Sequence, residues 1–475
     1  MFHPLSEKNW NRYSAAHLLN RAGFGGTPAE IDRLHALGPD KAVASFLDAD
    51  DDSDLFPPPP LMDPEARFSY YQRVKEAADE EQRKVLRKDF TRTDREEILS
   101  LRVWWLNRMR YTSDPLREKT TLFWHGHFAT SNQKVKDAFA MWQQNETLRH
   151  HALGRFPAML KEMSRDPAMI KWLDLNQSRR DHPNENFARE VMELFSLGEG
   201  HYSESDVMEA AKAFTGYRID PKACSFRMDK KAFDPGPKTV FGKMGNFSGD
   251  EIIDMITAMP QCARFIGRKL WTFFVAENPD EETVSGVAGL LLGNGYDIGA
   301  TLGVIFRSEG FYSPKVVHHQ IKSPVEWMIQ TTKMLEIPLP DTLVLDNALS
   351  ILGQILFAPP NVKGWDGGRS WISASSLLYR YNLAAYLLSG KARILGGGKG
   401  VTARVPLDQI ISPGERGSRM LLLNHLVFRV FNAPATEKES AAYLDFLTNH
   451  PTPFSDQTIL DFMQTMMSSP SYQLN

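Results

Sequence analysis

The sequence is poor in cysteine and in net charge, and each absence excludes a class of protein. Only two of its 475 residues are cysteine, Cys224 and Cys262. Two cysteines are too few for a disulfide framework, so we expect a reducing compartment, although a single bridge between the two stays open. The formal net charge of -3 lacks the basic excess of nucleic-acid-binding proteins, and we expect no nucleic-acid partner.

Long apolar runs and a secretion signal are missing as well. One of the longest apolar stretches, residues 284–306, is interrupted by Asn294, Asp297 and several glycines, so we expect no membrane span. The first residues do not show a basic segment followed by an apolar run and a small-residue cleavage site, which predicts a cytoplasmic protein without a signal peptide. An exported protein whose leader had been removed would give the same pattern.

Several widespread catalytic motifs are absent too. The sequence contains no GxxxxGK[ST] or GxGxxG loop, no HExxH, no CxxC pair and no GxSxG. It also lacks the two ExxH motifs of ferritin-like di-iron bundles. Nucleotide-binding, zincin and serine-hydrolase functions therefore have no motif to support them.

The apolar residues that are present recur mostly with helical spacing. This spacing predicts a mainly α-helical, multi-helix globular fold. The DPGPK motif at 234–238 separates short β-prone runs, which predicts a small β-hairpin insertion at 221–247. We expect one helical domain at 14–385 that contains this insertion. It would be followed by a Gly-rich linker or lid at 386–417 and by a small helical tail at 418–475 that packs on the main domain.

Two histidines one residue apart lie in an aromatic run, TLFWHGHFATSN, at 121–132. A helix that begins at Pro115 places Glu118 and His125 on one face. If that helix continues, His127 points away from His125; if it ends at the glycine between them, the two rings can converge. Converging imidazoles would hold a metal ion such as zinc, iron, copper or nickel. In the alternative, both are buried histidines that bond to backbone carbonyls.

A second group of polar residues lies on a predicted helix, NENFAREVMELF, whose N-cap is Asn184. At about 100° per residue, one stripe of this helix carries Asn186, Arg189, Glu190 and Glu193. The stripe is either a solvent face with an Arg189–Glu193 pair or a set of inward-facing carboxylates that bind a metal or transfer protons. It contains no lysine and opens with Asn184-Glu185-Asn186, which is unusual for a purely solvated face.

His201 lies just beyond this helix, before a capping box formed by Ser203 and Asp206. A histidine between two helix ends is well placed to present a ligand. It is equally well placed to cap the carbonyls of the preceding helix.

Long motifs occur in a fixed order along the chain. They include LREKTTLFWHGHFATS, DPAMIKWLDLNQS, NENFAREVMELFSLGEGHYSESDVMEAAKAFTGY and PPNVKGWDGGRSWI. Together these motifs resemble the large bacterial family called domain of unknown function 1800 (DUF 1800), over about residues 14–385.

The resemblance implies that the family's signature blocks include His125, His127, Asn184, Glu185, Asn186, Arg189, Glu190 and Glu193. Family members are often exported and are often encoded beside a sulfatase-like companion, which implies an envelope or extracellular polymer as substrate. They often carry a histidine before the aspartate of the hairpin, where this sequence has Phe233 before Asp234. That difference affects activity if the family's histidine is a ligand.

We expect the histidine pair and the helix at 184–193 to pack together as the site of a metal-dependent enzyme. Hydrolysis is favoured because a metal ion held by histidines and carboxylates can activate a water. The expected ligands of a divalent or transition metal ion are His125, His127 and Glu190, and the expected catalytic residues are Glu190, Arg189 and Glu193. Further candidate site residues are Glu118, Asn184, Glu185, Asn186 and His201.

Two alternatives use the same residues. An iron or copper oxidoreductase would employ similar ligands. A non-catalytic binding or assembly protein would bury these polar side chains in a mutually bonded network.

Overall fold

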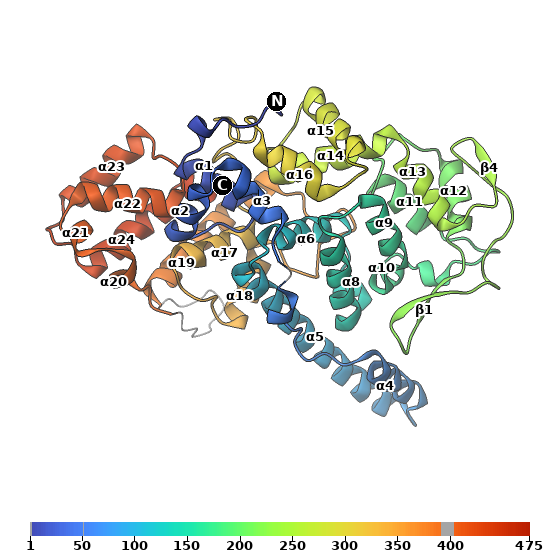
Figure 1. The fold of residues 1–475 in the computed structure, drawn as a ribbon. Helices are drawn as coiled ribbons and strands as arrows, with labels where there is room; N and C mark the ends of the chain where they lie inside the picture. The colour runs from blue at the N-terminus through green and yellow to red at the C-terminus, as the bar shows by residue number, and fades with distance from the viewer. Residues whose placement is uncertain (1, 51, 391–402) are drawn as a thin grey trace.

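The computed structural model describes residues 2–50, 52–390 and 403–475. These residues form an elongated array of helices with a few short β-strands (Figure 1). The prediction of a mainly α-helical fold with a small β insertion is confirmed.

The helices follow one another in groups along the chain. The first groups comprise α1 (Arg12–Ala22), α2 (Pro28–Ala36), α3 (Pro39–Leu47), α4 (Pro64–Glu76) and α5 (Glu80–Tyr111). The next comprise α6 (Pro115–His127), α7 (Asn132–Val135), α8 (Ala138–His151), α9 (Phe156–Arg165), α10 (Pro167–Trp172), α11 (Glu185–Glu193), α12 (Glu204–Ala213) and α13 (Gly249–Thr257). Then come α14 (Pro260–Phe274), α15 (Glu281–Gly293), α16 (Ile298–Arg307), α17 (Pro324–Met334), α18 (Thr342–Leu352) and α19 (Ala374–Ser389). The last are α20 (Leu407–Ile410), α21 (Pro413–Arg416), α22 (Arg419–Phe431), α23 (Glu437–Thr448) and α24 (Asp456–Met467).

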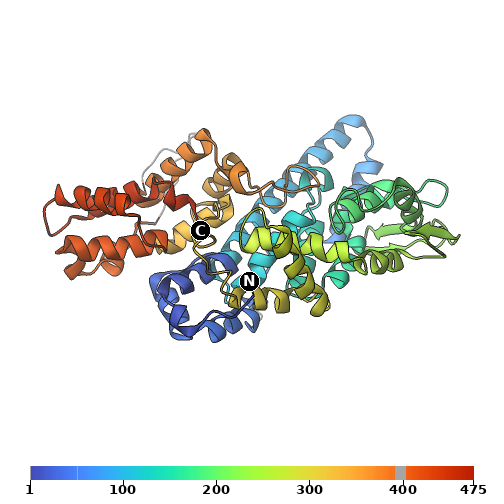
Figure 2. The same ribbon diagram turned by 90° about the horizontal axis from the view of Figure 1, so that it is seen from above.

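The C-terminal helices and the β insertion lie at opposite ends of the molecule. Helices α20 to α24 form one end, and α11 to α13 with the strands form the other, in both views (Figures 1 and 2). The N-terminal helices lie between these ends, and the α4–α5 hairpin projects from the body (Figure 1).

The β insertion consists of two antiparallel hairpins. β1 (Tyr217–Asp220) pairs with β2 (Ser225–Met228), and β3 (Lys238–Val240) pairs with β4 (Lys243–Gly245). Phe241 and Gly242 have φ angles of 51° and 73°, and a two-residue turn between β3 and β4 requires left-handed residues at both positions. The DPGPK motif lies between the two hairpins and links them. The insertion begins at Tyr217, before the predicted start at residue 221.

The segment predicted as a Gly-rich linker or lid lies partly outside the described residues, because these omit 391–402. Its described part includes the end of α19 and the short helices α20 and α21. The lid role and the domain boundaries around this segment stay predictions.

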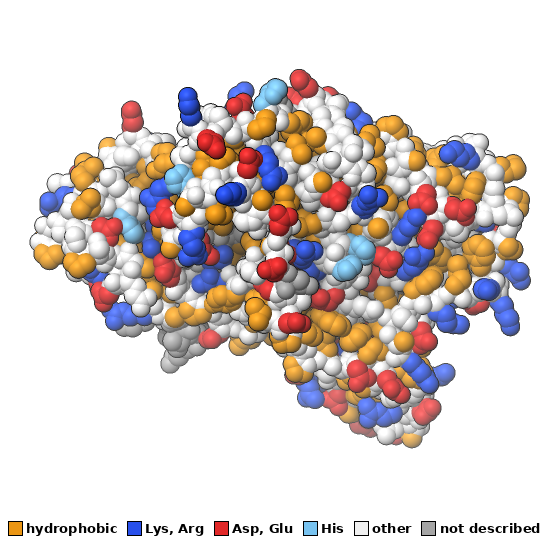
Figure 3. All heavy atoms as spheres, in the orientation of Figure 1, with side chains coloured by type: hydrophobic (Ala, Val, Ile, Leu, Met, Phe, Trp, Pro, Cys, Tyr) orange, Lys and Arg blue, Asp and Glu red, His pale blue; other side chains and the backbone are white. Residues whose placement is uncertain are grey.

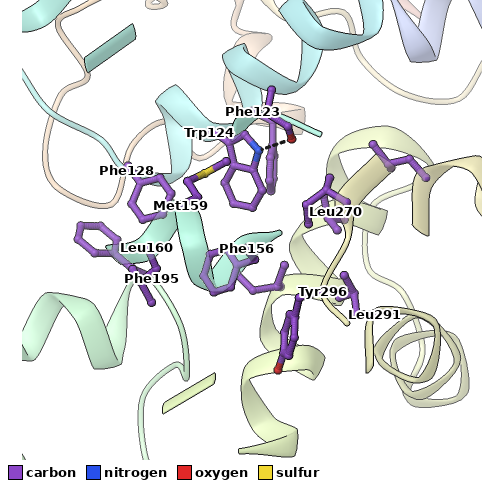
Figure 4. Packing of buried hydrophobic residues seen from close by; sticks show 14 of the residues in the cluster. Phe123, Trp124, Phe128, Phe156, Met159, Leu160, Phe195, Leu270, Leu291 and Tyr296 are labelled. Carbon is purple, nitrogen blue, oxygen red and sulfur yellow. Dashed lines mark hydrogen bonds between the residues drawn. The ribbon is translucent and has the colours of Figure 1, made fainter. Parts of the chain in front are cut away.

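Two clusters of buried side chains form the core. One packs around Trp124 of α6, whose ring lies 5.8 Å from that of Phe128 and 5.7 Å from that of Phe156. Its indole nitrogen donates to the carbonyl of Ala152 (Figure 4). The other cluster joins α5, α17 and α19 to the C-terminal helices, for which Phe462 is an example.

The surface carries charged side chains of both signs, which lie interspersed on the face seen in Figure 3. Within residues 2–50, 52–390 and 403–475, no helix is both long enough and apolar enough to cross a membrane.

A buried arginine holds the α4–α5 hairpin to the body. Arg67 of α4 is 3% exposed, and its guanidinium pairs with Asp94 and Glu97 of α5. Its Nε also lies 3.3 Å from Asp137, the N-cap residue of α8. One cation therefore joins three buried carboxylates and fixes the direction in which the hairpin projects.

Replacing Arg67 with methionine removes this cation and keeps much of the side-chain volume. Because Asp94, Glu97 and Asp137 lose their shared partner in a buried setting, we expect the free energy of unfolding to fall by about 3–5 kcal/mol. Urea unfolding measures the change. Lys75→Met, at an exposed position of the same helix, is the control, and we expect a change of at most about 0.5 kcal/mol. Equal stability of the two variants would contradict this account of the hairpin.

Candidate functional site

A cavity of about 470 Å³ lies beside α6. Its walls come mainly from α6, α14, the start of α17 and the loop at 363–371. The side chains that line it include Phe123, His127, Lys269, Phe273, Ser323, Glu326, Lys363, Trp365, Arg369 and Trp371. This volume falls in the range of small-molecule binding pockets, about 300–1,000 Å³. We call it the α6 cavity.

Helix α6 continues through both histidines and ends at His127, so the two rings contact different neighbours. Nε2 of His125 accepts a hydrogen bond of 3.0 Å from the backbone N–H of Phe357. Nε2 of His127 lies 3.0 Å from the carbonyl oxygen of Phe195. The helix therefore turns His127 toward the cavity and His125 toward the chain that precedes the 363–371 loop, and the rings do not converge.

His127 connects the end of α11 to a lysine in the cavity wall. The carbonyl of Phe195 can only accept, so Nε2 of His127 carries the proton and Nδ1 presents a lone pair. Nζ of Lys269 lies 3.2 Å from that Nδ1 and 3.4 Å from the carbonyl oxygen of Leu194. Leu194 and Phe195 directly follow α11, and a helix leaves its last carbonyls without partners inside the helix.

The surroundings of Lys269 make its ammonium easier to deprotonate than that of an ordinary lysine. Burial lowers its pKa from 10.5 to about 8. Burial, together with the charge of Lys269, holds the pKa of His127 well below 6.5, so the imidazole is neutral. In a neutral Lys269 the two N–H bonds donate to His127 Nδ1 and to the Leu194 carbonyl, which leaves the nitrogen lone pair unengaged.

His125 positions the loop that forms one wall of the cavity. Its Nε2 accepts a hydrogen bond from the backbone N–H of Phe357. The backbone N–H of Asn132 donates to the carbonyl of Phe357 at 2.9 Å. Phe357 has a φ of 60°, a left-handed conformation that is costly for a bulky side chain and persists only where neighbours hold it. His125 and Asn132 supply that restraint.

Two glycines let the loop approach its neighbours closely. Gly364 has a φ of 84°, and a Cβ there would lie 2.2 Å from the carbonyl oxygen of Gly126 in α6. Gly368 has a φ of 52°, and its Cβ would lie 2.3 Å from a carboxylate oxygen of Glu277. A side chain at position 364 would push the loop away from the backbone of α6, whereas at position 368 the positive φ disfavours any residue other than glycine.

The polar stripe of α11 mostly makes surface and structural bonds. Asn184 is the N-cap residue, as predicted, and its side-chain amide donates to the carbonyls of Leu173 and Asp174. Asn186 also donates to Leu173. Arg189 pairs with Glu185 and Glu204, rather than with Glu193.

Glu190 is acted on electrostatically by a residue that lines the cavity, Lys363. Burial and the neighbouring charge of Glu193 raise the pKa of Glu190, while Arg189 and Lys363 lower it. Glu193 accepts a hydrogen bond of 2.6 Å from the hydroxyl of Tyr202. His201 is exposed.

Glu118 belongs to a buried network on another side of α6. Trp105 and Arg108 of α5 donate to its carboxylate at 2.8 and 2.7 Å, and Arg149 of α8 donates to both of its oxygens. Although burial alone would raise the pKa of Glu118, the two arginines hold it below its ordinary value. This carboxylate therefore acts as a structural anion.

Metal binding by His125, His127 and Glu190 stays a prediction. Both Nε2 atoms are engaged by backbone groups. In the part of the chain that the structure describes, no three His, Cys, Asp or Glu side chains are grouped as potential metal ligands. A metal ion bound by these residues would have to replace hydrogen bonds that they now make.

Sequence reasoning missed Lys269, although a signal for it exists. In α14 the buried residues Cys262 and Ile266 and the cavity residue Phe273 follow a helical period, and Lys269 occupies the next position of that period. A lysine where the period predicts an apolar residue indicates a buried or cavity-lining amine.

Phe233, which stands where the resemblance implies a histidine, does not line the α6 cavity. Its ring lies 5.3 Å from Nζ of Lys238, and that ammonium donates to the carbonyls of Asp234 and Gly236. In this chain the position therefore supports the turn between the two hairpins.

Comparison with known proteins identifies one family. A family model described as "Protein of unknown function (DUF1800)" matches residues 17–474, nearly the whole chain. No curated protein and no solved structure matches.

The neutral state of His125 predicts a pH dependence of stability. Burial lowers its pKa from 6.5 to about 3, so between these values the unfolded chain binds a proton that the folded protein excludes. Folding is therefore favoured above pH 6.5 and loses about 1.4 kcal/mol per pH unit from this group as the pH falls toward 3.

We expect His125→Gln, whose amide oxygen can still accept the Phe357 N–H, to reduce the slope of unfolding free energy against pH by about one proton. Urea unfolding at several pH values from about 4.5 to 6.5 measures this slope. His201→Gln, at an exposed position, should leave it unchanged. The same slope in wild type and His125→Gln would show that His125 protonates freely in the folded protein.

Proposed function

The chain belongs to the DUF1800 family, whose description assigns no activity, and we propose that it is a hydrolase in which Lys269 transfers protons in the α6 cavity. The observation that carries this proposal is the position of the Lys269 amine, whose Nζ lies 3.2 Å from His127 Nδ1 and 3.4 Å from the Leu194 carbonyl oxygen. This amine lines a ligand-sized cavity.

The proposed reaction uses Lys269 first as a base and then as an acid. The neutral amine removes a proton from a water while the oxygen of that water attacks an electrophilic centre of the bound substrate. The ammonium then gives the proton to the departing group as its bond to that centre breaks, which restores the amine. A pKa of about 8 suits this exchange, because general bases work best when their pKa lies near the ambient pH.

His127 is a positioning residue in this scheme. Its own N–H is engaged by the Phe195 carbonyl, so its free lone pair can only accept from Lys269. That bond holds one N–H of the amine, and the Leu194 carbonyl holds the other. Together they orient the lone pair that takes the proton.

Metal-dependent hydrolysis is the rival within the same reaction class, and an iron or copper oxidoreductase would use the same ligands. Both are supported by the HxH motif and by the position of His127 in the cavity wall. A metal ion would supply Lewis-acid activation of water or a redox centre. In either case Nδ1 of His127 would be released from Lys269 in order to bind the metal.

A non-catalytic binding or assembly role is supported by a different observation. Glu118 and His125, two of the residues predicted for the site, are buried and bonded to neighbouring elements. Such bonding is what a structural network requires. A structural network leaves the amine of Lys269 in the cavity without a role, and we therefore rank the enzyme first.

Three further proposals rest on the family resemblance alone. They are an envelope or extracellular polymer as substrate, a sulfatase-like companion protein, and export from the cytoplasm. Fractionation of cells that produce the protein at natural levels tests the last of these.

The low pKa of Lys269 is measurable without a known substrate. We expect its acetylation by acetic anhydride to reach half of its maximal rate near pH 8, about two pH units below an ordinary lysine. Mass spectrometry of the digested protein follows each lysine, and exposed Lys8 is the internal reference. A midpoint for Lys269 equal to that of Lys8 would remove the basis of the proposal.

Hydrolysis of a panel of nitrophenyl carboxylate, phosphate and sulfate esters and glycosides tests the activity itself. For any substrate that is turned over, we expect Lys269→Met to lower kcat by about 10²–10⁴-fold, the usual loss for a proton-transferring residue. Lys8→Met is the matched control. Undiminished hydrolysis by Lys269→Met would assign the reaction to another group.

Elemental analysis distinguishes the Lys269 route from the metal route. If Lys269 is the proton-transferring group, the metal content of the purified protein should be the same in wild type and in a folded His127→Ala variant. One metal equivalent in the wild type that disappears in His127→Ala would instead establish the metal-dependent reaction.

A further inference from the structure

We propose that the α6 cavity binds an organic anion, a molecule that joins a carboxylate, phosphate or sulfate group to an aromatic or apolar part. The inference rests on the proposed function only in that it assigns the ligand to the same cavity. It does not depend on the protonation state of Lys269.

Two arginines and two lysines, all buried, lie around a single carboxylate in the cavity wall. Glu326, which lines the cavity, forms an ion pair with Lys119 of α6. Arg21 and Arg380 also act electrostatically on Glu326. Arg380 acts in the same way on Lys322. All four basic side chains are at most 5% exposed. Within the described ranges, the pair with Glu326 is the one ion pair that any of them makes.

Burial lowers the pKa of Lys322 to about 7 and that of Lys119, which is paired with Glu326, to about 8. The excess of buried positive charge therefore rests on Arg21 and Arg380. Arg21 and Lys322 donate to backbone carbonyls, and Arg380 to a carbonyl and an amide, and none of these acceptors carries a full charge. Nη1 of Arg21 and Nε of Arg380 are buried and have no hydrogen-bond partner among the residues that the structure describes. Charges in a low-dielectric interior act over longer distances than charges in water, so this excess makes the neighbouring cavity attractive to an anion.

The rim of the cavity adds cations that an incoming ligand meets first. Lys363 and Arg369 are exposed on the 363–371 loop. Arg268, also at the rim, is paired with Glu281. The rim acids are Asp366 and Glu277, and the latter packs against Gly368. The positive potential therefore comes mainly from the buried group, and the rim cations extend it to the solvent.

Aromatic side chains indicate that the ligand is larger than an inorganic ion. Phe123 and Phe273 lie on the helical walls of the cavity, and Trp365 and Trp371 lie on the loop. Aromatic rings favour contact with planar or apolar groups, and about 470 Å³ accommodates far more than one phosphate.

Calorimetric titration with phenyl phosphate, phenyl sulfate and benzoate tests the proposal, with chloride used to match the ionic strength. We expect at least one of these probes to bind at least about tenfold more tightly than inorganic phosphate or sulfate and than uncharged phenol. The probe that binds most tightly identifies the charged group. If none binds better than phenol, the cavity does not select anions and the proposal fails.

A double variant, Lys363→Met with Arg369→Met, locates the binding. Both positions are exposed, so the fold should be retained, and we expect the affinity for the best probe to fall at least about tenfold. Lys88→Met with Arg95→Met removes the same charge from a basic groove on α5 and is the matched control. Equal losses in both double variants, or no loss in either, would overturn the assignment to the α6 cavity.

The outcomes separate this inference from the proposed function. Anion binding that depends on Lys363 and Arg369, together with an ordinary acetylation midpoint for Lys269, would refute the hydrolase scheme and support the binding site. A low midpoint for Lys269 without anion binding would leave the proton-transfer scheme standing and exclude an anionic ligand.

Discussion

Burial of α6 on nearly all sides is the constraint on which the rest of the structure depends. A polar side chain that leaves water must find a partner in the protein, and four side chains of this helix find theirs on different neighbouring elements. Glu118 bonds to α5 and α8, and Lys119 pairs with α17. His125 holds the chain at Phe357, and His127 contacts the end of α11 and Lys269 of α14. These bonds position the elements that surround the cavity.

The same constraint explains why two histidines occur one residue apart in an aromatic run. A neutral imidazole is mostly ring and packs among aromatic side chains, yet it carries one donor and one acceptor. His125 uses its acceptor to stabilise a left-handed residue, and His127 uses both groups to join a carbonyl to an amine. The motif that suggests a metal pair in the sequence thus serves two separate connections in the fold, one of which reaches the cavity.

Local features of the fold could be predicted from the sequence because their causes are local. The N-cap at Asn184 and the capping box at Ser203 depend on residues within one turn of helix, and the structure contains both. The divergence of the histidines was left open, because it depends on whether α6 continues past Gly126. Its continuation is favoured by tertiary packing that no local pattern records. Lys269 was missed since its partner His127 lies 142 residues away in the sequence.

The position of α6 has a consequence for how the molecule unfolds. Trp124 and Phe128 belong to the hydrophobic cluster around α9, α14 and α16, whereas Leu122 belongs to the cluster shared with the C-terminal helices. Neither cluster can come apart without exposing part of α6 and breaking ionic bonds that join α6 to the other cluster. We therefore expect a loss of packing at one end of this elongated chain to weaken the other, although the two ends lie far apart in space.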